Sequence, residues 1–246
     1  MSSHTFEASP RTYARIGGVF YLVIIVAGIF GEAFVRGSIV VSGDAAATAN
    51  NILASPLLWR LGIVTDLLMH ACDIPLMLVL YVLLKPVNRH LALLAILFNL
   101  IQTAILTTNK LNLVMPLFLL GGADYLSAFE PSQLQALSYA AIRLHGHGFS
   151  VGLIFFGFVC LIQGYLIFTS GYFPKILGVL MQGAGLCYLI NSFLLLLAPA
   201  FATMLFPAIL MPAFIAELSL CIWLLVKGVN VPKWEETRNA SRVKGA

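Results

Sequence analysis

The sequence predicts an all-α, polytopic integral membrane protein: a bundle of six transmembrane helices with short external interfacial helices. Two observations predict this class. First, 60% of the 246 residues are hydrophobic, only 10% are charged, and the mean hydropathy is +0.96, whereas a soluble domain has about 25% charged residues. Second, six apolar segments each reach the length of about 20 residues that a helix needs to cross a hydrocarbon core of about 30 Å.

The six predicted spans follow one another with short connections. They cover residues 14–35, 61–84, 91–111, 149–168, 173–198 and 204–226. Segment 131–144 mixes apolar and polar side chains, which predicts an amphipathic interfacial helix in place of a seventh span. After the first span, Asp44 is expected to cap a short helix over 45–54 that ends at Ser55-Pro56. We expect one membrane domain, residues 14–229, between an N-terminal tail, 1–13, and a basic C-terminal tail, 230–246.

The basic residues predict the orientation of these spans. With six spans both termini share one side of the membrane. That side holds Arg11, Arg15, Lys85, Arg89, Lys175, Lys227, Lys233, Arg238, Arg242 and Lys244, against Arg36, Arg60 and Arg143 on the other. By the positive-inside rule both termini are cytoplasmic. Glu7 and the poor cleavage site Gly31-Glu32-Ala33 indicate an uncleaved first helix in place of a signal peptide.

Composition also excludes several function classes. The formal net charge is only +4, and the basic residues stand at helix ends without interleaved aromatics, so nucleic acid is not an expected partner. Four cysteines lie in apolar runs without CxxC spacing, which favours unpaired thiols. No HExxH, GxSxG or P-loop motif occurs.

Polar residues inside the spans are the candidate functional residues, because an ionisable side chain at the bilayer centre costs a few kcal/mol or more unless a partner, water or a function compensates. Asp66, His70 and Asp73 stand at i, i+4 and i+7 and share one stripe of the second span. At 1.5 Å per residue, Asp73 comes near the midplane and Asp66 near the outer boundary. The predicted midplane layer consists of His70, Asp73, Asn99, Gln102 and Glu217.

A second polar layer is predicted near the outer boundary. Its members are Glu32, Asp66, Lys110, Arg143, His145, His147 and Asn191. Because charge runs from the outer surface to the centre and then stops, we expect a polar cavity open to the outside and closed toward the cytoplasm.

The alternative to a cavity is a set of contacts that only fix helix packing. Asp66 would then pair with Arg60 or Arg143, and Asp73 with His70 and Gln102. Pro212 is expected to kink the sixth span within about a turn and a half of Glu217 and to free backbone carbonyls that could bind a cation or a water.

A divalent metal is a weaker hypothesis. Asp66, His70, His145 and His147 supply four plausible ligand types for zinc or a similar ion. His145 and His147 reach one ion only in non-helical backbone, which Gly146 and Gly148 permit. Without a metal, a histidine beside a carboxylate could carry protons. Apart from this metal, no cofactor is expected.

Four strings carry a family resemblance. LLKPVN at 83–88, LHGHGFSVGLIFFGF at 144–158, GYLIFTSGYFPKILGVL at 164–180 and AELSLCIWLLVKGV at 216–229 resemble the bacterial membrane proteins described as domain of unknown function 4386. The resemblance covers about residues 14–229. It implies a small multi-pass protein of a bacterial inner membrane and supplies no activity. It also implies that Asp73, His145 and Glu217 match the family's acidic and histidine positions, while an aromatic residue often replaces His147, so the metal hypothesis loses a ligand.

The leading hypothesis is the binding or translocation of a small polar solute, a cation or a proton. Asp73 and Glu217 would form the central charged pair, with His70 as proton partner and Asp66, His145 and Gln102 as further candidates. One alternative is a membrane-embedded, metal-dependent hydrolase that uses Asp66, His70 and His145. Another is a structural or assembly subunit that binds other membrane proteins or a second copy of itself.

Overall fold

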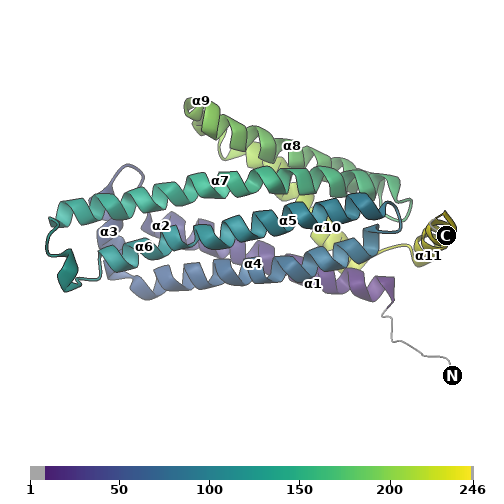
Figure 1. Ribbon diagram of the computed structural model, residues 1–246, viewed down its shortest axis with the longest axis horizontal. Coiled ribbons are helices and arrows are strands. Elements are labelled where there is room, and N and C mark those ends of the chain that lie inside the picture. Colours follow the sequence, from purple (N-terminus) through teal and green to yellow (C-terminus); the bar gives the residue numbers. More distant parts are fainter. Residues whose placement is uncertain (1–8, 245–246) are drawn as a thin grey trace, which may run out of the picture.

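The computed structural model describes residues 9–244, and every element in that part of the chain is a helix (Figure 1). Glu7 and most of the predicted tail 1–13 lie outside the described residues. The elements are α1 (Pro10–Ile29), the π-helix η1 (Phe30–Arg36), α2 (Gly37–Ile39), α3 (Ala45–Ala54), α4 (Pro56–Leu84), α5 (Arg89–Asn109), α6 (Leu111–Leu119), η2 (Asp124–Leu126), α7 (Pro131–Thr169), α8 (Lys175–Leu197), α9 (Pro199–Leu205), η3 (Ala208–Leu210), α10 (Met211–Val226) and α11 (Val231–Lys244).

Within residues 9–244, six helical stretches are long and apolar enough to cross a membrane, which confirms the predicted fold class. They are Pro10–Ile39, Pro56–Leu84, Arg89–Leu119, Pro131–Thr169, Lys175–Leu197 and Ala208–Val226. The first four are longer than expected. In particular, the segment 131–144 is not a separate interfacial helix but the first part of the 39-residue helix α7.

The six spans close into a ring. α1 packs on α4, α4 on α5, α5 on α7, α7 on α8, α8 on α10, and α10 returns to α1. The tightest contact joins α7 and α8, where glycines face each other: a Cβ on Gly178 would lie 2.6 Å from the carbonyl oxygen of Gly164. Side chains from all six helices therefore meet inside one ring, and most of them are apolar.

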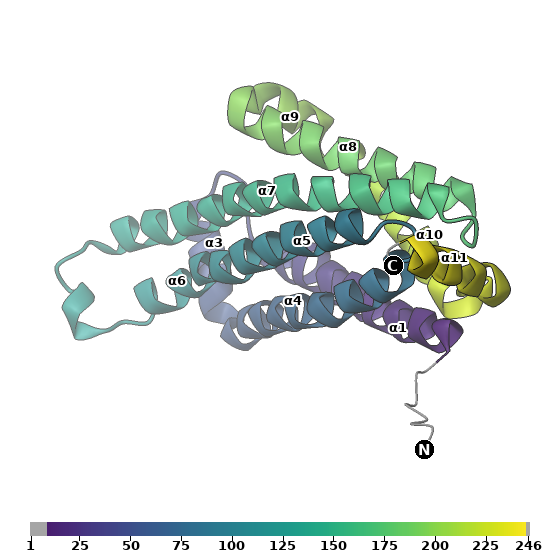
Figure 2. The same ribbon diagram turned by 45° about the vertical axis from the view of Figure 1, so that its right-hand side comes forward.

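The start of α1 and the whole of α11 lie at the same end of the ring (Figures 1 and 2). Trp234 of α11 is buried, and its indole N–H donates to the carbonyl oxygen of Leu83 at 3.0 Å. The hydroxyl of Tyr172 donates to the same oxygen at 2.7 Å, and burial raises the pKa of this phenol. This end of the bundle, which we call the terminal end, is sealed by apolar and aromatic side chains.

Two smaller predictions are confirmed. Asp44 accepts a hydrogen bond from the Ala47 N–H at 2.8 Å and so caps α3, which ends where Ser55 and Pro56 follow. All four cysteines are free thiols.

Candidate functional site

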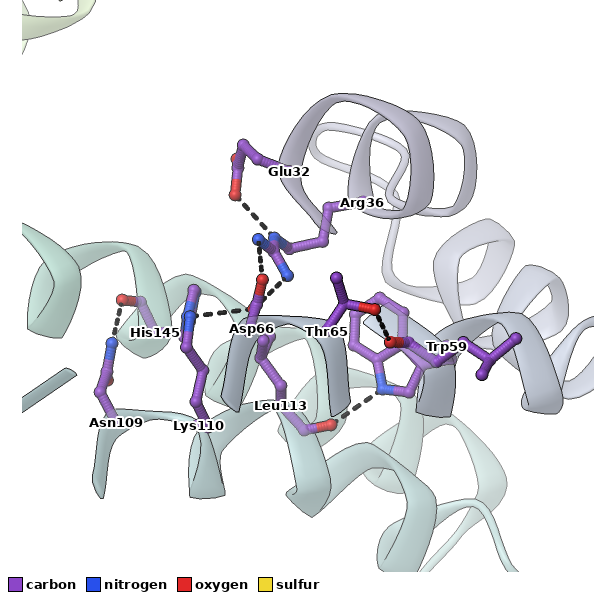
Figure 3. Close-up of polar contacts among 10 residues, drawn as sticks. Glu32, Arg36, Trp59, Thr65, Asp66, Asn109, Lys110, Leu113 and His145 are labelled. Atoms are coloured by element: carbon purple, nitrogen blue, oxygen red, sulfur yellow. Dashed lines mark hydrogen bonds and ion pairs between the residues drawn. The ribbon is translucent and has the colours of Figure 1, made fainter. Parts of the chain in front are cut away.

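An ionic cluster, drawn in Figure 3, lies in the half of the ring away from the termini. It consists of Glu32 and Arg36 from η1, Asp66 from α4, Lys110 from the turn between α5 and α6, and His145 from α7. The Arg36 guanidinium reaches Asp66 Oδ2 at 2.7 Å and Oδ1 at 3.3 Å. Lys110 Nζ lies 2.9 Å from the same Oδ2. Asp66, with no exposed surface, is therefore held by two cations.

The outer edge of the cluster is formed by Glu32, whose side chain is 70% exposed and accepts from Arg36 Nε at 2.6 Å. On the inner side, Lys110 Nζ lies 3.2 Å from His145 Nε2. An ammonium group only donates, so this ring nitrogen accepts and the imidazole is neutral. Two carboxylates and two cations balance, and the cluster carries no net charge.

Local backbone features position these side chains. In η1 the Gly37 N–H bonds back to the Glu32 carbonyl, five residues earlier, and such π-turns are frequent at functional sites. A Cβ on Gly31 would collide with Asp66 Oδ1, so only glycine lets η1 approach α4 this closely. Lys110 itself stands at the break between α5 and α6, where its backbone N–H donates to the backbone carbonyl oxygen of Thr107.

The predicted outer layer is thus only partly correct. The structure brings together Glu32, Asp66, Lys110 and His145, but the partners of Asp66 are Arg36 and Lys110, and not Arg60 or Arg143. The expected open cavity is also wrong at this place, because the cluster's own side chains fill it: Lys110 is 3% and His145 5% exposed.

The same geometry does not favour the metal hypothesis. Both oxygens of Asp66 are already bound by Arg36. His145 and His147 stand at i and i+2 inside the continuous helix α7, so they point in different directions. Among the described residues, no group of three or more His, Cys, Asp or Glu side chains could hold a metal ion.

A second polar group, which we call the central layer, lies about 10 Å along α4 from Asp66. Asp73 Oδ2 accepts from the Asn99 amide at 3.0 Å and from the Thr103 hydroxyl at 2.7 Å, both on α5. The Thr103 hydroxyl also lies 3.5 Å from Gln102 Oε1, and among the described residues Gln102 forms no hydrogen bond with Asp73. The predicted Asp73–His70 contact is also absent among the described residues; His70 is buried and its Nε2 has no hydrogen-bond partner there.

Glu217 completes the central layer from the other side of the ring. It is hydrogen-bonded by the hydroxyl of Tyr188 on α8, and Tyr21 on α1 is a second hydrogen-bonding neighbour. The charges of Glu217 and Asp73 lie within electrostatic range of each other, and Cys160 of α7 is a neighbour of both. Pro212 does not kink the helix as expected, since it lies in the first turn of α10.

All six spans therefore contribute a polar or titratable side chain to the central layer. The contributors are Tyr21, Asp73, Asn99 with Thr103, Cys160, Tyr188 and Glu217. In the part of the chain that the structure describes, neither Asp73 nor Glu217 has an ion-pair partner, and every salt bridge found there involves Asp66 or Glu32.

Sequence reasoning missed the two tyrosines and the role of Arg36. Tyr21 and Tyr188 stand in the middle of their spans, whereas membrane tyrosines usually concentrate at the interfaces. A tyrosine buried at mid-span needs a partner for its hydroxyl, so this position was the available signal. The expected first span ends at residue 35 and leaves Arg36 in the following loop, whereas the π-helix η1 continues the helix through Arg36.

These features define a class: a polytopic membrane protein whose six helices enclose titratable side chains. The chain matches the family described as domain of unknown function (DUF4386) over residues 16–228, and it belongs to that family. An uncharacterized protein of Archaeoglobus fulgidus is 31% identical over 156 residues, which cover 63% of this chain and 76% of the relative. No solved structure matches the chain significantly. A bacterial source and an inner-membrane location stay predictions.

Proposed function

We propose that this protein binds a small cation or a proton in its central layer and carries it across the membrane, with Asp73 and Glu217 as the binding carboxyl groups. One observation carries the proposal: Asp73 is buried and Glu217 half-buried, and among the described residues neither carboxyl group has a cationic partner. An unpaired carboxylate in the membrane interior is costly, so each of these groups gains from a bound proton or a bound cation.

The contrast with Asp66 supports this proposal. The same helix carries two carboxylates two turns apart, and only Asp66 is neutralised within the protein, by Arg36 and Lys110. The donors around Asp73 and Glu217 are neutral amides and hydroxyls. Such donors hold a carboxyl group in place without supplying charge, so the site stays able to exchange a proton for a cation.

The ionic cluster lies between the central layer and the outer end of the ring, and in this structure it is closed. We therefore assign it the role of an outer gate, which opens when Arg36 and Lys110 release Asp66. His70 stands on α4 between the two groups, with Asp66 and Lys110 in electrostatic range, and its unpartnered Nε2 fits the predicted role of a proton carrier between them.

The test is proton flux in proteoliposomes that enclose a pH-sensitive dye and face an imposed gradient of sodium, potassium or ammonium chloride. Wild type is expected to move protons in response to at least one of these gradients. D73N and E217Q keep the shape of the side chains but cannot exchange a proton, so each is expected to lower the flux at least about tenfold, equivalent to about 1.4 kcal/mol.

The matched control is D124N, at an exposed external residue in η2, which is expected to leave the flux unchanged. Wild-type flux in a D73N or E217Q variant, with the protein still monodisperse, overturns the proposal.

A further inference from the structure

A groove of about 360 Å³ opens on the outward face of the ring along the seam between α4 and α5. It is lined by Ile74, Leu100, Thr103, Ala104, Thr107 and Thr108, and we call it the α4–α5 groove. The two helices lie side by side (Figures 1 and 2). Its volume falls within the range of small-molecule sites, roughly 300 to 1,000 Å³, and its walls are mostly apolar.

The inner end of the groove reaches the central layer. Thr103 lines the groove and is itself only 7% exposed, and its hydroxyl donates to Asp73 Oδ2 at 2.7 Å. The Asp73 carboxyl group therefore lies one hydrogen bond behind the groove wall. Ile74, the next residue on α4, is half exposed and forms part of the wall. A positive charge placed at this end would lie close to the Asp73 carboxylate, which has no ion pair within the described residues.

The outer end of the groove carries two unpartnered hydroxyls. Every other threonine in the described part of the chain has its hydroxyl hydrogen-bonded, several of them to the carbonyl one turn back. The side-chain hydroxyls of Thr107 and Thr108 form no hydrogen bond among the described residues, and both residues line the groove. An orphan hydroxyl facing hydrocarbon costs free energy, so these two favour an occupant that brings polar hydrogens with it.

The groove also faces the lipid. Leu100 is 47% and Ile74 50% exposed, and both lie on spans that cross the membrane. Counted from Arg89, Thr103 is about 21 Å along α5 and Thr108 about 28 Å, so the groove runs through the half of the bilayer that holds the ionic cluster. A ligand that dissolves in that leaflet reaches Asp73 without passing the outer gate.

We propose that the α4–α5 groove binds a lipophilic cation, an ammonium group on an apolar chain, with the charge beside Asp73 and Thr103 and the apolar part along Leu100 and Ala104. This inference rests on the proposed function, since it names the class of cation that Asp73 receives. Charge complementarity argues for this occupant over the acyl chain of a lipid, which would leave the Asp73 carboxyl group without an ion-pair partner.

The test uses photoaffinity labelling in lipid nanodiscs with a dodecylamine that carries a diazirine on its chain. After irradiation, peptide mapping by mass spectrometry is expected to place adducts on α4 and α5 at the groove residues. An excess of dodecyltrimethylammonium should displace the label, and an equal excess of dodecyl sulfate should not. Displacement by both detergents, or by neither, shows a lipid-filled seam and overturns the proposal.

Two variants separate this inference from the proposed function. A104W fills the groove from an exposed position, so it should fold, abolish labelling, and leave proton exchange driven by ammonium or metal-ion gradients intact. Its matched control, L186W, is on the lipid face of α8 and should label as wild type does. D73N should lower labelling on the order of tenfold.

Each failure has its own meaning. Labelling unchanged in A104W removes the groove as the site while the cation-carrier proposal stands. Labelling abolished by A104W but unchanged in D73N removes the charge recognition. Loss of proton exchange in A104W would show that the groove variant damages the central layer, and the claim that the two are separable would be wrong.

Discussion

At the scale of single residues, three carboxyl groups in the spans have different partners. Asp66 is fully buried and paired with two cations. Asp73 is bound by an amide and a hydroxyl, and Glu217 by tyrosine hydroxyls. The first arrangement is a paired charge between helices, while the other two have only neutral donors and are the groups that we propose to bind a proton or a cation. The neighbours of each carboxyl group therefore decide whether its charge is paired.

The first prediction concerns the paired carboxylate. Lys110→Met removes one of its two cations and leaves an uncompensated negative charge in a buried cluster, so the free energy of unfolding should fall by about 3 kcal/mol. Unfolding by denaturant in detergent micelles measures this. The control, Lys227→Met at an exposed position, should change the free energy of unfolding by no more than about 0.5 kcal/mol.

The double variant D66N/K110M removes the charge of Asp66 together with its partner, so it should recover part of the lost stability. A Lys110→Met protein as stable as wild type would contradict the account.

At the scale of elements, the sequence predicts the number and places of the spans well, because the bilayer thickness sets a length that hydropathy reveals. It failed where tertiary contacts decide. Glycines at 146 and 148 suggested a break before the fourth span, but α7 continues, and the amide of Asn109 occupies the space where a Cβ on Gly148 would lie. The partners of Asp66 and Asp73 were missed for a related reason: one sequence gives the stripe a residue lies on, but not which helix faces that stripe.

The second prediction tests the contact between α7 and α8. A Cβ on Gly185 would lie 2.6 Å from the carbonyl oxygen of Gly157, whereas a Cβ on Gly183, in the same helix, meets nothing within 4 Å. Gly185→Ala should therefore push the two helices apart and lower the melting temperature. Gly183→Ala should leave it unchanged or raise it, since alanine favours a helix by about 1 kcal/mol. Thermal unfolding in detergent decides, and equal effects of the two variants would show that the close approach does not stabilise the bundle.

At the scale of the whole molecule, the two ends of the ring differ in chemistry. The terminal end is sealed by aromatic and apolar groups such as Trp234 and Tyr172, while the opposite end holds the ionic cluster. The central layer lies between them and borders the α4–α5 groove through Thr103. In the proposed function a cation would enter by a polar route, through the gate at the ionic cluster, and the further inference adds a second route from the lipid.

The third prediction fixes which side these ends face. Lys85, Arg89, Lys175 and Lys227 lie at the terminal end, whereas Arg36, one of the three basic residues counted for the other side, is paired with Glu32 and Asp66 in the cluster. The positive-inside rule then places the terminal end in the cytoplasm. A C-terminal green fluorescent protein fusion expressed in a bacterium should fluoresce, and a C-terminal alkaline phosphatase fusion should be inactive. The reverse pattern would show that the terminal end faces the outside, and it would place the ionic cluster on the cytoplasmic side.

The central claim is that Asp73 and Glu217 take up a proton or a cation because the protein gives them no cationic partner. Infrared difference spectroscopy of the protein in nanodiscs tests it most directly, since a protonated carboxyl group in an apolar setting has its own carbonyl-stretch band. We expect a band that D73N or E217Q removes and that disappears when a bound cation displaces the proton. A spectrum in which both carboxyl groups keep one state across the whole pH range and with every added cation would contradict the account.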